Sequence, residues 1–331
     1  MRRIVLATTL LGFMAGLTSS ASAAEGILPT EAQIKKKTLD KEGWHPKLSF
    51  GASVAVASNS NVVGQVDGSS WTLGFSMLGG LDYRQGVHDW INTLSISEVF
   101  TRTPIVDEFV KSADVFTFES IYYMRLSEMF GPFASFKLDS SLFEGTNVQS
   151  NAVDFSLDGD IIKASTTSIK LTDSFQPLAL KEAIGAFYKP ITTPEVAVAF
   201  RAGFGATQVF ADGSLVLADD GGTANIIELA ELSSFSQAGA VIAADITGTM
   251  DDGRVSYGAK AEVLFPFIND DAQDRSVIDL TNYDFSAKLS FKLFEWASLN
   301  YEIKALLQPE LIEEWQVQNN LLLTFNYSAV N

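Results

Sequence analysis

Charged side chains recur at every second position in several apolar segments of this sequence, and they are the residues best placed to do chemistry. The charged residues predicted to share the inward, polar face of these segments are Glu98, Glu119, Arg125, Lys137, Asp139, Arg201, Asp245, Arg254, Lys260, Glu262, Asp284, Lys288, Lys292, Glu302 and Lys304. Groups of both signs on one face of a sheet can pair across neighbouring strands. They can also line a passage that selects small polar or anionic solutes.

The sequence has few of the residues and motifs that catalysis would need. The chain has two histidines, His45 and His88, and neither lies in a metal-binding or nucleophile motif. The first precedes an alternating segment and the second lies in a short connection, so we expect both to be polar turn residues. No phosphate-binding or dinucleotide-binding fingerprint is present, and the chain has no cysteine. The sequence predicts neither an enzyme nor a cofactor.

Carboxylates gather in the longer connections between segments. These clusters comprise Asp154, Asp158, Asp160, Asp212, Asp219, Asp220, Asp270, Asp271, Asp274, Glu310, Glu313 and Glu314. Oxygen-rich clusters can hold calcium or magnesium, or bridge through divalent ions to lipopolysaccharide phosphates. None has the spacing of an EF-hand loop, so the sequence favours solvated loop tips and predicts no metal site.

The strands that must position these residues are recognised from the spacing of apolar and polar residues. After residue 44 about a dozen segments alternate apolar and polar residues, as in 70–84 and 235–250, and short connections alternate with long ones. This pattern is typical of a transmembrane, antiparallel, up-and-down β-barrel with short periplasmic turns and long outer loops. A soluble β-sandwich also alternates, but it lacks this asymmetry of connections. The longest connection, 144–173, has room for a hairpin and could fold inward as a constriction or stand outward.

Two details of the predicted strands bear on the barrel surface. Aromatic residues are expected in two girdles at the membrane interfaces. The inner girdle comprises Tyr83, Trp90, Phe133, Tyr188, Phe294, Trp296 and Tyr327, and the outer one Trp71, Phe100, Phe116, Phe210, Phe267, Tyr283 and Trp315. Glu182 falls on the apolar face of its strand, where a charge in lipid is costly. We expect a bulge before Ile184, or a shifted register, to turn it inward.

The N-terminus has the form of a secretory signal peptide. Arg2 and Arg3 precede an apolar run, and small residues follow up to Ala23. The sequence therefore predicts a signal peptide at 1–23, a periplasmic N-terminal segment at 24–44 and the barrel at 45–331. Past the signal, no apolar run reaches the roughly 20 residues of a spanning helix.

The net charge limits the partners. The formal net charge is -17, and loss of Arg2 and Arg3 with the signal makes it -17 - 2 = -19. A polyanion does not bind nucleic acid readily. The expected partners are outer-membrane lipid and lipopolysaccharide, the barrel assembly machinery and small polar solutes. The expected location is the outer membrane of a Gram-negative cell envelope.

Several passages resemble an uncharacterised family of bacterial outer-membrane β-barrel proteins. They are Gly43-Trp44, Trp71 with Gly79-Gly80, the stretch from His88 to Leu94, Asp114, and the stretch from Leu180 to Pro190. The resemblance covers most of the mature chain and implies a barrel, but its motifs carry no catalytic residues. The sequence departs from it in the acidity of its loops and in Ser328–Asn331, which run past the aromatic ending.

Two functions fit this reading. The first is a narrow, porin-like channel for passive diffusion of small hydrophilic solutes through a charged lumen. The second is a non-conducting structural or surface-interaction barrel that acts through its long acidic loops. About twelve strands lie between the packed barrels of eight strands and the open porins of sixteen, so size does not decide between them.

Overall fold

The computed structural model describes residues 42–60, 67–106, 108–193, 195–218, 223, 225–271 and 273–330. The predicted signal peptide and nearly all of the predicted segment 24–44 lie outside this range. Among the described residues, no helix is long and apolar enough to cross a membrane.

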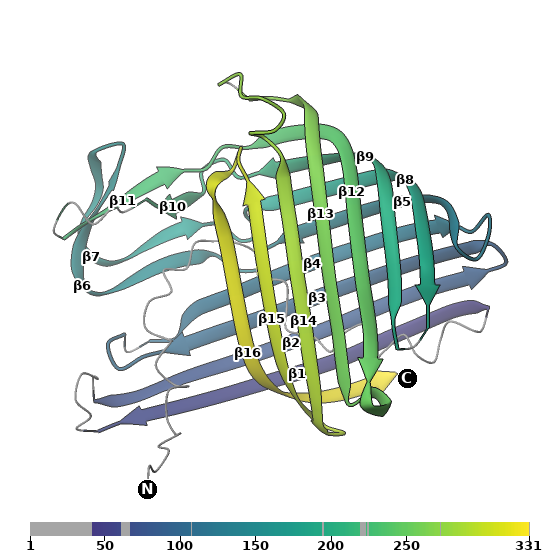
Figure 1. The fold of residues 1–331 in the computed structure, drawn as a ribbon. Helices are drawn as coiled ribbons and strands as arrows, with labels where there is room; N and C mark the ends of the chain where they lie inside the picture. Colours follow the sequence, from purple (N-terminus) through teal and green to yellow (C-terminus); the bar gives the residue numbers. More distant parts are fainter. Residues whose placement is uncertain are drawn as a thin grey trace, which may run out of the picture.

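Twelve antiparallel strands close into a barrel, which confirms the predicted fold class (Figure 1). The barrel strands are β1 (Gly43–Asn59), β2 (Gly68–Gln85), β3 (His88–Arg102), β4 (Val110–Met124), β5 (Phe130–Ser140), β8 (Leu178–Thr192), β9 (Ala197–Phe210), β12 (Phe235–Met250), β13 (Val255–Asn269), β14 (Asn282–Phe294), β15 (Ala297–Gln308) and β16 (Ile312–Val330). Closure is made by β1 pairing with β16. A short 3-10 helix, η1 (Asp251–Gly253), makes the turn between β12 and β13.

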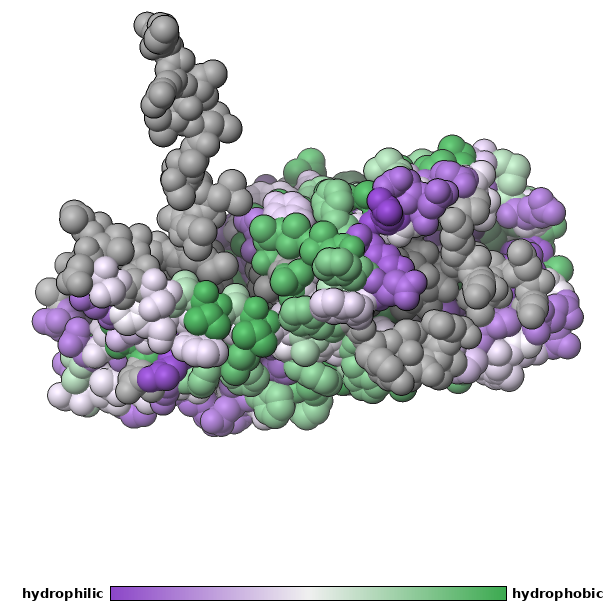
Figure 2. Space-filling view, turned by 90° about the horizontal axis from the view of Figure 1, so that it is seen from below, coloured by the Kyte–Doolittle hydropathy of each residue, from purple (hydrophilic) through white to green (hydrophobic). Residues whose placement is uncertain are grey.

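The strands form because their side chains alternate between two environments. In β2, Trp71 and Phe75 are 38% and 49% exposed on the outer face, whereas Ser76 and Leu78 are 5% exposed on the inner face. Figure 2 shows hydrophobic side chains gathered near the middle of the face in view. An apolar outer band around a polar interior is the arrangement that lipid requires of a barrel. The chain is therefore an outer-membrane type of β-barrel.

Inward-facing glycines allow the wall to fold sharply at β8, β9 and β12. A Cβ atom added to Gly203 would lie 2.1 Å from the carbonyl oxygen of Ile184, and one added to Gly239 would lie 1.8 Å from that of Phe265. No side chain fits such a close approach of backbones. In Figure 1 these strands join the wall formed by β1–β5 to the wall formed by β13–β16. The fold therefore brings two walls to face each other.

The two longest connections form a separate sheet beyond the long-loop end of the barrel. Its strands are β6 (Gly145–Leu157), β7 (Asp160–Thr172), β10 (Leu215–Leu217) and β11 (Ile226–Glu231), in the order β10-β11-β6-β7. The predicted hairpin is β6–β7, which turns at Asp158 and Gly159, both with positive φ. Figure 1 shows that it stands outward, away from the lumen. We call these four strands the outer sheet.

The outer sheet has a hydrophobic core of its own. Phe155 is 0% exposed and packs with Ile169, Leu171 and Leu229. Residues from both connections contribute, because β11 runs parallel to β6. The sequence did not predict β10 or β11, whose short segments are recognisable only when β6 lies beside them.

Two expectations about the barrel surface are wrong. The pairing of β8 with β5 and β9 is regular around Glu182, which lies opposite Phe136 and Ala206 on the outer face, so no bulge turns it inward. Phe133 does not belong to the inner girdle. It faces the lumen at 3% exposure and packs with Ile121, Tyr123 and Phe187.

Candidate functional site

The barrel register places most of the predicted charged residues on the lumen side. Directly opposed residues share a face, and the register opposes Glu119 to Lys137 and Asp245 to Lys260. The same inward rows contain Asp139, Arg201, Glu262, Asp284, Lys288, Lys292, Glu302 and Lys304. Arg125 follows β4 at the short-turn end, and its Nε atom lies 3.2 Å from the carboxylate of Asp89.

Ion pairs cross the lumen between facing walls. Lys181 Nζ on β8 lies 3.0 Å from Asp284 Oδ2 on β14, although three strands separate them in the barrel. Lys260 Nζ on β13 lies 3.7 Å from Glu119 Oε1 on β4, across four strands. Long side chains therefore meet in the interior, and the lumen is constricted at this level.

Neighbouring pairs extend these two crossings into one network. Arg201 lies 3.0 Å from Asp245, Lys260 lies 3.6 Å from Glu262, and Lys137 lies 3.1 Å from Asp139. We call the following residues the central charge network: Glu119, Lys137, Asp139, Lys181, Arg201, Asp245, Lys260, Glu262 and Asp284. With four cations and five carboxylates, its charges nearly cancel.

An apolar and aromatic layer lies in the lumen at the short-turn side of the network. Ile121, Tyr123, Phe133 and Phe187 are buried together. The ammonium of Lys189 lies 3.8 Å from the centre of the Tyr123 ring, which is a cation–π distance. This layer narrows the interior further.

Small polar side chains line the part of the lumen that lies between β14 and β16. Asn300 donates hydrogen bonds to Ser298 at 3.0 Å and to Thr324 at 2.9 Å, and it accepts one from Ser290 at 2.6 Å. Lys288 lies 3.2 Å from Glu302 in the same region. Hydroxyl and amide groups offer a solute neutral hydrogen-bond partners.

Two predicted lumen residues lie elsewhere. Arg254 follows η1 in the turn before β13, and its side chain is 75% exposed near Asp251. Glu98 lies opposite Phe75, whose side chain faces outward, so it shares the outer face. It is nevertheless only 6% exposed. The prediction that Glu98 faces inward is inconsistent with the alternation of its own strand, because Ile96 and Phe100, two residues away on either side, belong to the outer face.

Several lumen residues were missed. Lys181 is the most important, because it makes a crossing, and Lys47 with Asp82 forms a pair on β1 and β2. The inward-facing positions of β8 are hard to recognise from the sequence, because small residues such as Ala183 and Gly185 occupy several of them instead of polar ones. The register with Lys137 is what identifies Lys181 as inward.

The histidines lie at the short-turn end, His45 in β1 and His88 at the start of β3. The imidazole of His88 hydrogen-bonds to the hydroxyl of Tyr122. In the described parts of the chain, no group of three or more histidine or carboxylate side chains is placed to hold a metal ion.

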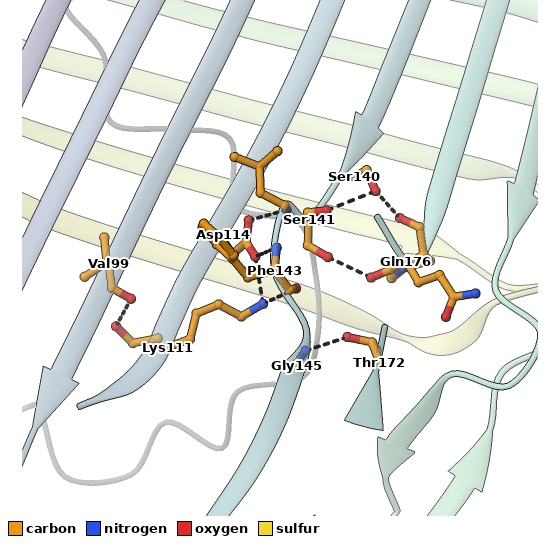
Figure 3. Close-up of polar contacts among 12 residues, drawn as sticks. Val99, Lys111, Asp114, Ser140, Ser141, Phe143, Gly145, Thr172 and Gln176 are labelled. Carbon is orange, nitrogen blue, oxygen red and sulfur yellow. Dashed lines mark hydrogen bonds and ion pairs between the residues drawn. The ribbon is translucent and has the colours of Figure 1, made fainter. Parts of the chain in front are cut away.

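The base of the outer sheet is fixed to the barrel by one buried carboxylate (Figure 3). Asp114 on β4 accepts hydrogen bonds from the backbone N–H groups of Leu142 at 2.7 Å and Phe143 at 2.8 Å. Lys111 donates to Asp114 and to the carbonyl of Phe143, both at 2.7 Å. The side chain of Asp114 is 2% exposed. Charge-assisted bonds of this kind hold the chain firmly where it leaves β5.

Further hydrogen bonds fix the other segments that connect the outer sheet to the barrel strands. Ser141 donates to the carbonyl of Gln176 at 2.8 Å, and the backbone N–H of Ser234 donates to Asp212 at 2.9 Å. The hydrogen bonds from Ser234 lower the pKa of Asp212.

At the neighbouring loops, hydrogen bonds from Arg275 lower the pKa of Asp271. Arg275 also donates to Glu313 at the start of β16 at 2.8 Å and to the carbonyl of Pro309 at 3.2 Å, so it joins the β13–β14 loop to the β15–β16 loop.

Comparison with known proteins gives solved structures only. No protein-family model matches the chain, and no curated protein matches it. The translocator domain of the autotransporter NalP from Neisseria meningitidis is 10% identical, with a TM-score of 0.37 over 90% of this chain and 92% of that one. An outer-membrane channel from Pseudomonas putida F1 is 12% identical, with a TM-score of 0.37 over 88% and 96%. Pseudomonas putida OprB is 10% identical, with a TM-score of 0.28 over 95% and 100%.

Proposed function

We propose that this outer-membrane barrel is a narrow channel for passive diffusion of small hydrophilic solutes. The observation that carries the proposal is the central charge network, which spans the lumen between facing walls. Buried ion pairs contribute little net stability, and well-packed apolar residues of similar volume often do better. A barrel that served only as a support would gain little from such an interior, whereas a channel needs polar groups along its path.

The balance of charges favours a solute with little net charge. Cations and carboxylates of the network are paired, so they present alternating signs rather than a field of one sign. The hydroxyl and amide groups near Asn300 add neutral donors and acceptors. Small polar solutes fit this lining better than simple anions do.

Ion selectivity tests the proposal. We expect Arg201→Gln, Lys260→Gln and Lys288→Gln to shift the reversal potential in a salt gradient toward cation preference, because each removes a lumen cation. Arg254→Gln is the matched control, since its side chain lies in an exposed turn. A selectivity unchanged by all three lumen substitutions, in folded protein, would contradict the proposal.

A second function is favoured by the outer sheet. Loops that are merely solvated need no core, yet Phe155 and Leu229 from two separate connections are buried against each other. The alternative is a non-conducting barrel that presents this sheet to a partner at the cell surface, with lipopolysaccharide as the nearest candidate. Replacing 145–172 by a short Gly-Ser turn separates the two functions, because a channel would still conduct and a presenting barrel would lose its binding.

The route to the membrane completes the proposal. The residues at 1–23 would direct export and be removed, and the barrel assembly machinery would insert the strands. No enzymatic step, cofactor or metal enters the proposal. Intact mass of the protein from outer membranes tests the predicted cleavage after Ala23.

A further inference from the structure

Glu98 is buried at the outer face of the barrel beside the carboxylate of Asp114. It is 6% exposed, and no N–H or O–H group of the described residues donates a hydrogen bond to either of its carboxylate oxygens. An unpaired buried carboxylate is strongly disfavoured in its charged form, because burial removes its water and supplies nothing in exchange. The buried position of Glu98 therefore favours its protonated, neutral form.

The groups around Glu98 reinforce this. Asp114 on β4 lies directly opposite in the register, and Phe75 lies opposite on β2. The charged groups that face Glu98 are Asp114 and Lys111, and Lys111 is engaged with Asp114 at 2.7 Å. Two opposed carboxylates repel each other when both are charged. One of the two must remain charged, since Asp114 accepts three hydrogen bonds.

We propose that Glu98 is a proton-binding site that holds the base of the outer sheet, so that loss of its proton loosens the contact between Asp114 and the Leu142–Phe143 segment. While Glu98 is neutral, Asp114 keeps its bonds to the two backbone N–H groups. When Glu98 becomes charged, repulsion and hydration draw the two carboxylates apart. The outer sheet then loses its fixed position on β4.

The direction of the pH dependence follows from linkage. An unfolded glutamate titrates near about 4.3, and a glutamate that keeps its proton in the folded barrel binds more protons folded than unfolded above that pH. Stability of this region is therefore greatest at acid pH and falls as the pH rises. Most paired carboxylates behave in the opposite way, which makes the effect recognisable.

Hydrogen exchange of the refolded full-length protein in micelles tests the proposal. Between about pH 6 and 9.5, protection of Leu142 and Phe143, corrected for intrinsic exchange, should fall at least about tenfold, because each bond to a charged acceptor is worth about a factor of ten or more. Glu98→Gln should keep the acid-side protection throughout. Glu128→Gln, in an exposed turn at the other end of the barrel, should behave as the natural protein.

Three results would overturn the proposal. They are protection that is flat with pH in the natural protein, an unchanged pH dependence in Glu98→Gln, and failure of this neutral isostere to fold. Infrared spectra give an independent reading. The natural protein at neutral pH should show the carbonyl band of a protonated carboxyl group that Glu98→Gln lacks, and its absence would contradict the proposal even if the exchange data agreed.

Discussion

Lys181 Nζ lies 3.0 Å from Asp284 Oδ2, although β9, β12 and β13 separate their strands in the barrel. This contact ties one wall of the lumen to the facing wall. Only 16% and 12% of the two side chains are exposed, so the pair is largely removed from water. Its energetic behaviour should be that of a buried ion pair rather than a surface one.

Breaking this pair on one side should cost stability. Asp284→Asn leaves Lys181 buried without its partner, and we expect a loss of about 2–4 kcal/mol in the free energy of unfolding. The double variant Lys181→Met with Asp284→Leu should recover most of that loss, because no uncompensated charge remains. Urea unfolding, followed by heat-modifiable gel mobility, measures both. Equal stability of the single variant and the natural protein would argue against a crossing contact.

The sharp fold of the wall can be tested with matched glycines. Gly203→Ala places a Cβ atom 2.1 Å from a backbone oxygen, so the strands must move apart. We expect a loss of about 2–3 kcal/mol or failure to refold, as for overpacked sites. Gly258→Ala is the control, because the nearest atom to its Cβ would be 3.5 Å away. Comparable refolding yields for the two variants would refute the crowding argument.

Glu182 is a carboxylate on the lipid side of the barrel. One of its oxygens is buried and has no hydrogen-bond partner among the residues that the structure describes. Glu182→Leu should raise the free energy of unfolding by about 1 kcal/mol or more, because acidic residues on the lipid face are destabilising. Glu295→Leu, in an exposed turn, should leave it unchanged. Destabilisation by Glu182→Leu would mean that Glu182 has a partner in the membrane.

Arg275 provides a pH-dependent brace between two outer loops. Its hydrogen bonds lower the pKa of Asp271. A depressed carboxyl pKa gives a contribution that is present above the unfolded value of about 3.9 and is lost as the pH falls through the folded value. Exchange protection at 270–271 and 273–276 should therefore be present at neutral pH and vanish in acid.

Arg275→Gln should remove this protection at both pH values, and Asp274→Asn, an exposed neighbour, should preserve it. Full protection at neutral pH in Arg275→Gln would show that other contacts hold the loop.

Strand positions were predictable where side chains alternate strictly. The segment Phe235–Met250 is predicted with its observed bounds because Ala240, Ile242 and Ile246 alternate with polar or small residues up to a tight turn. The period of two reports which face a residue occupies. The same two-residue period therefore predicts most of the side chains that line the lumen.

Features that depend on closure could not be predicted from that period. The pairing of Lys181 with Asp284 depends on how two walls approach, which the glycines at 203 and 239 control through backbone contact. Strand β11 exists because β6 offers it an edge. The residue type of Phe133 predicts a place in a girdle, whereas the register turns its side chain into the lumen.

Single-channel conductance of the purified, refolded protein in a planar bilayer is the measurement that decides whether the lumen conducts. A narrow polar lumen should give small, stable, discrete conductance steps. A bilayer that stays silent, with protein shown to be folded by heat-modifiable gel mobility, would contradict the channel and favour a barrel that acts through its outer sheet.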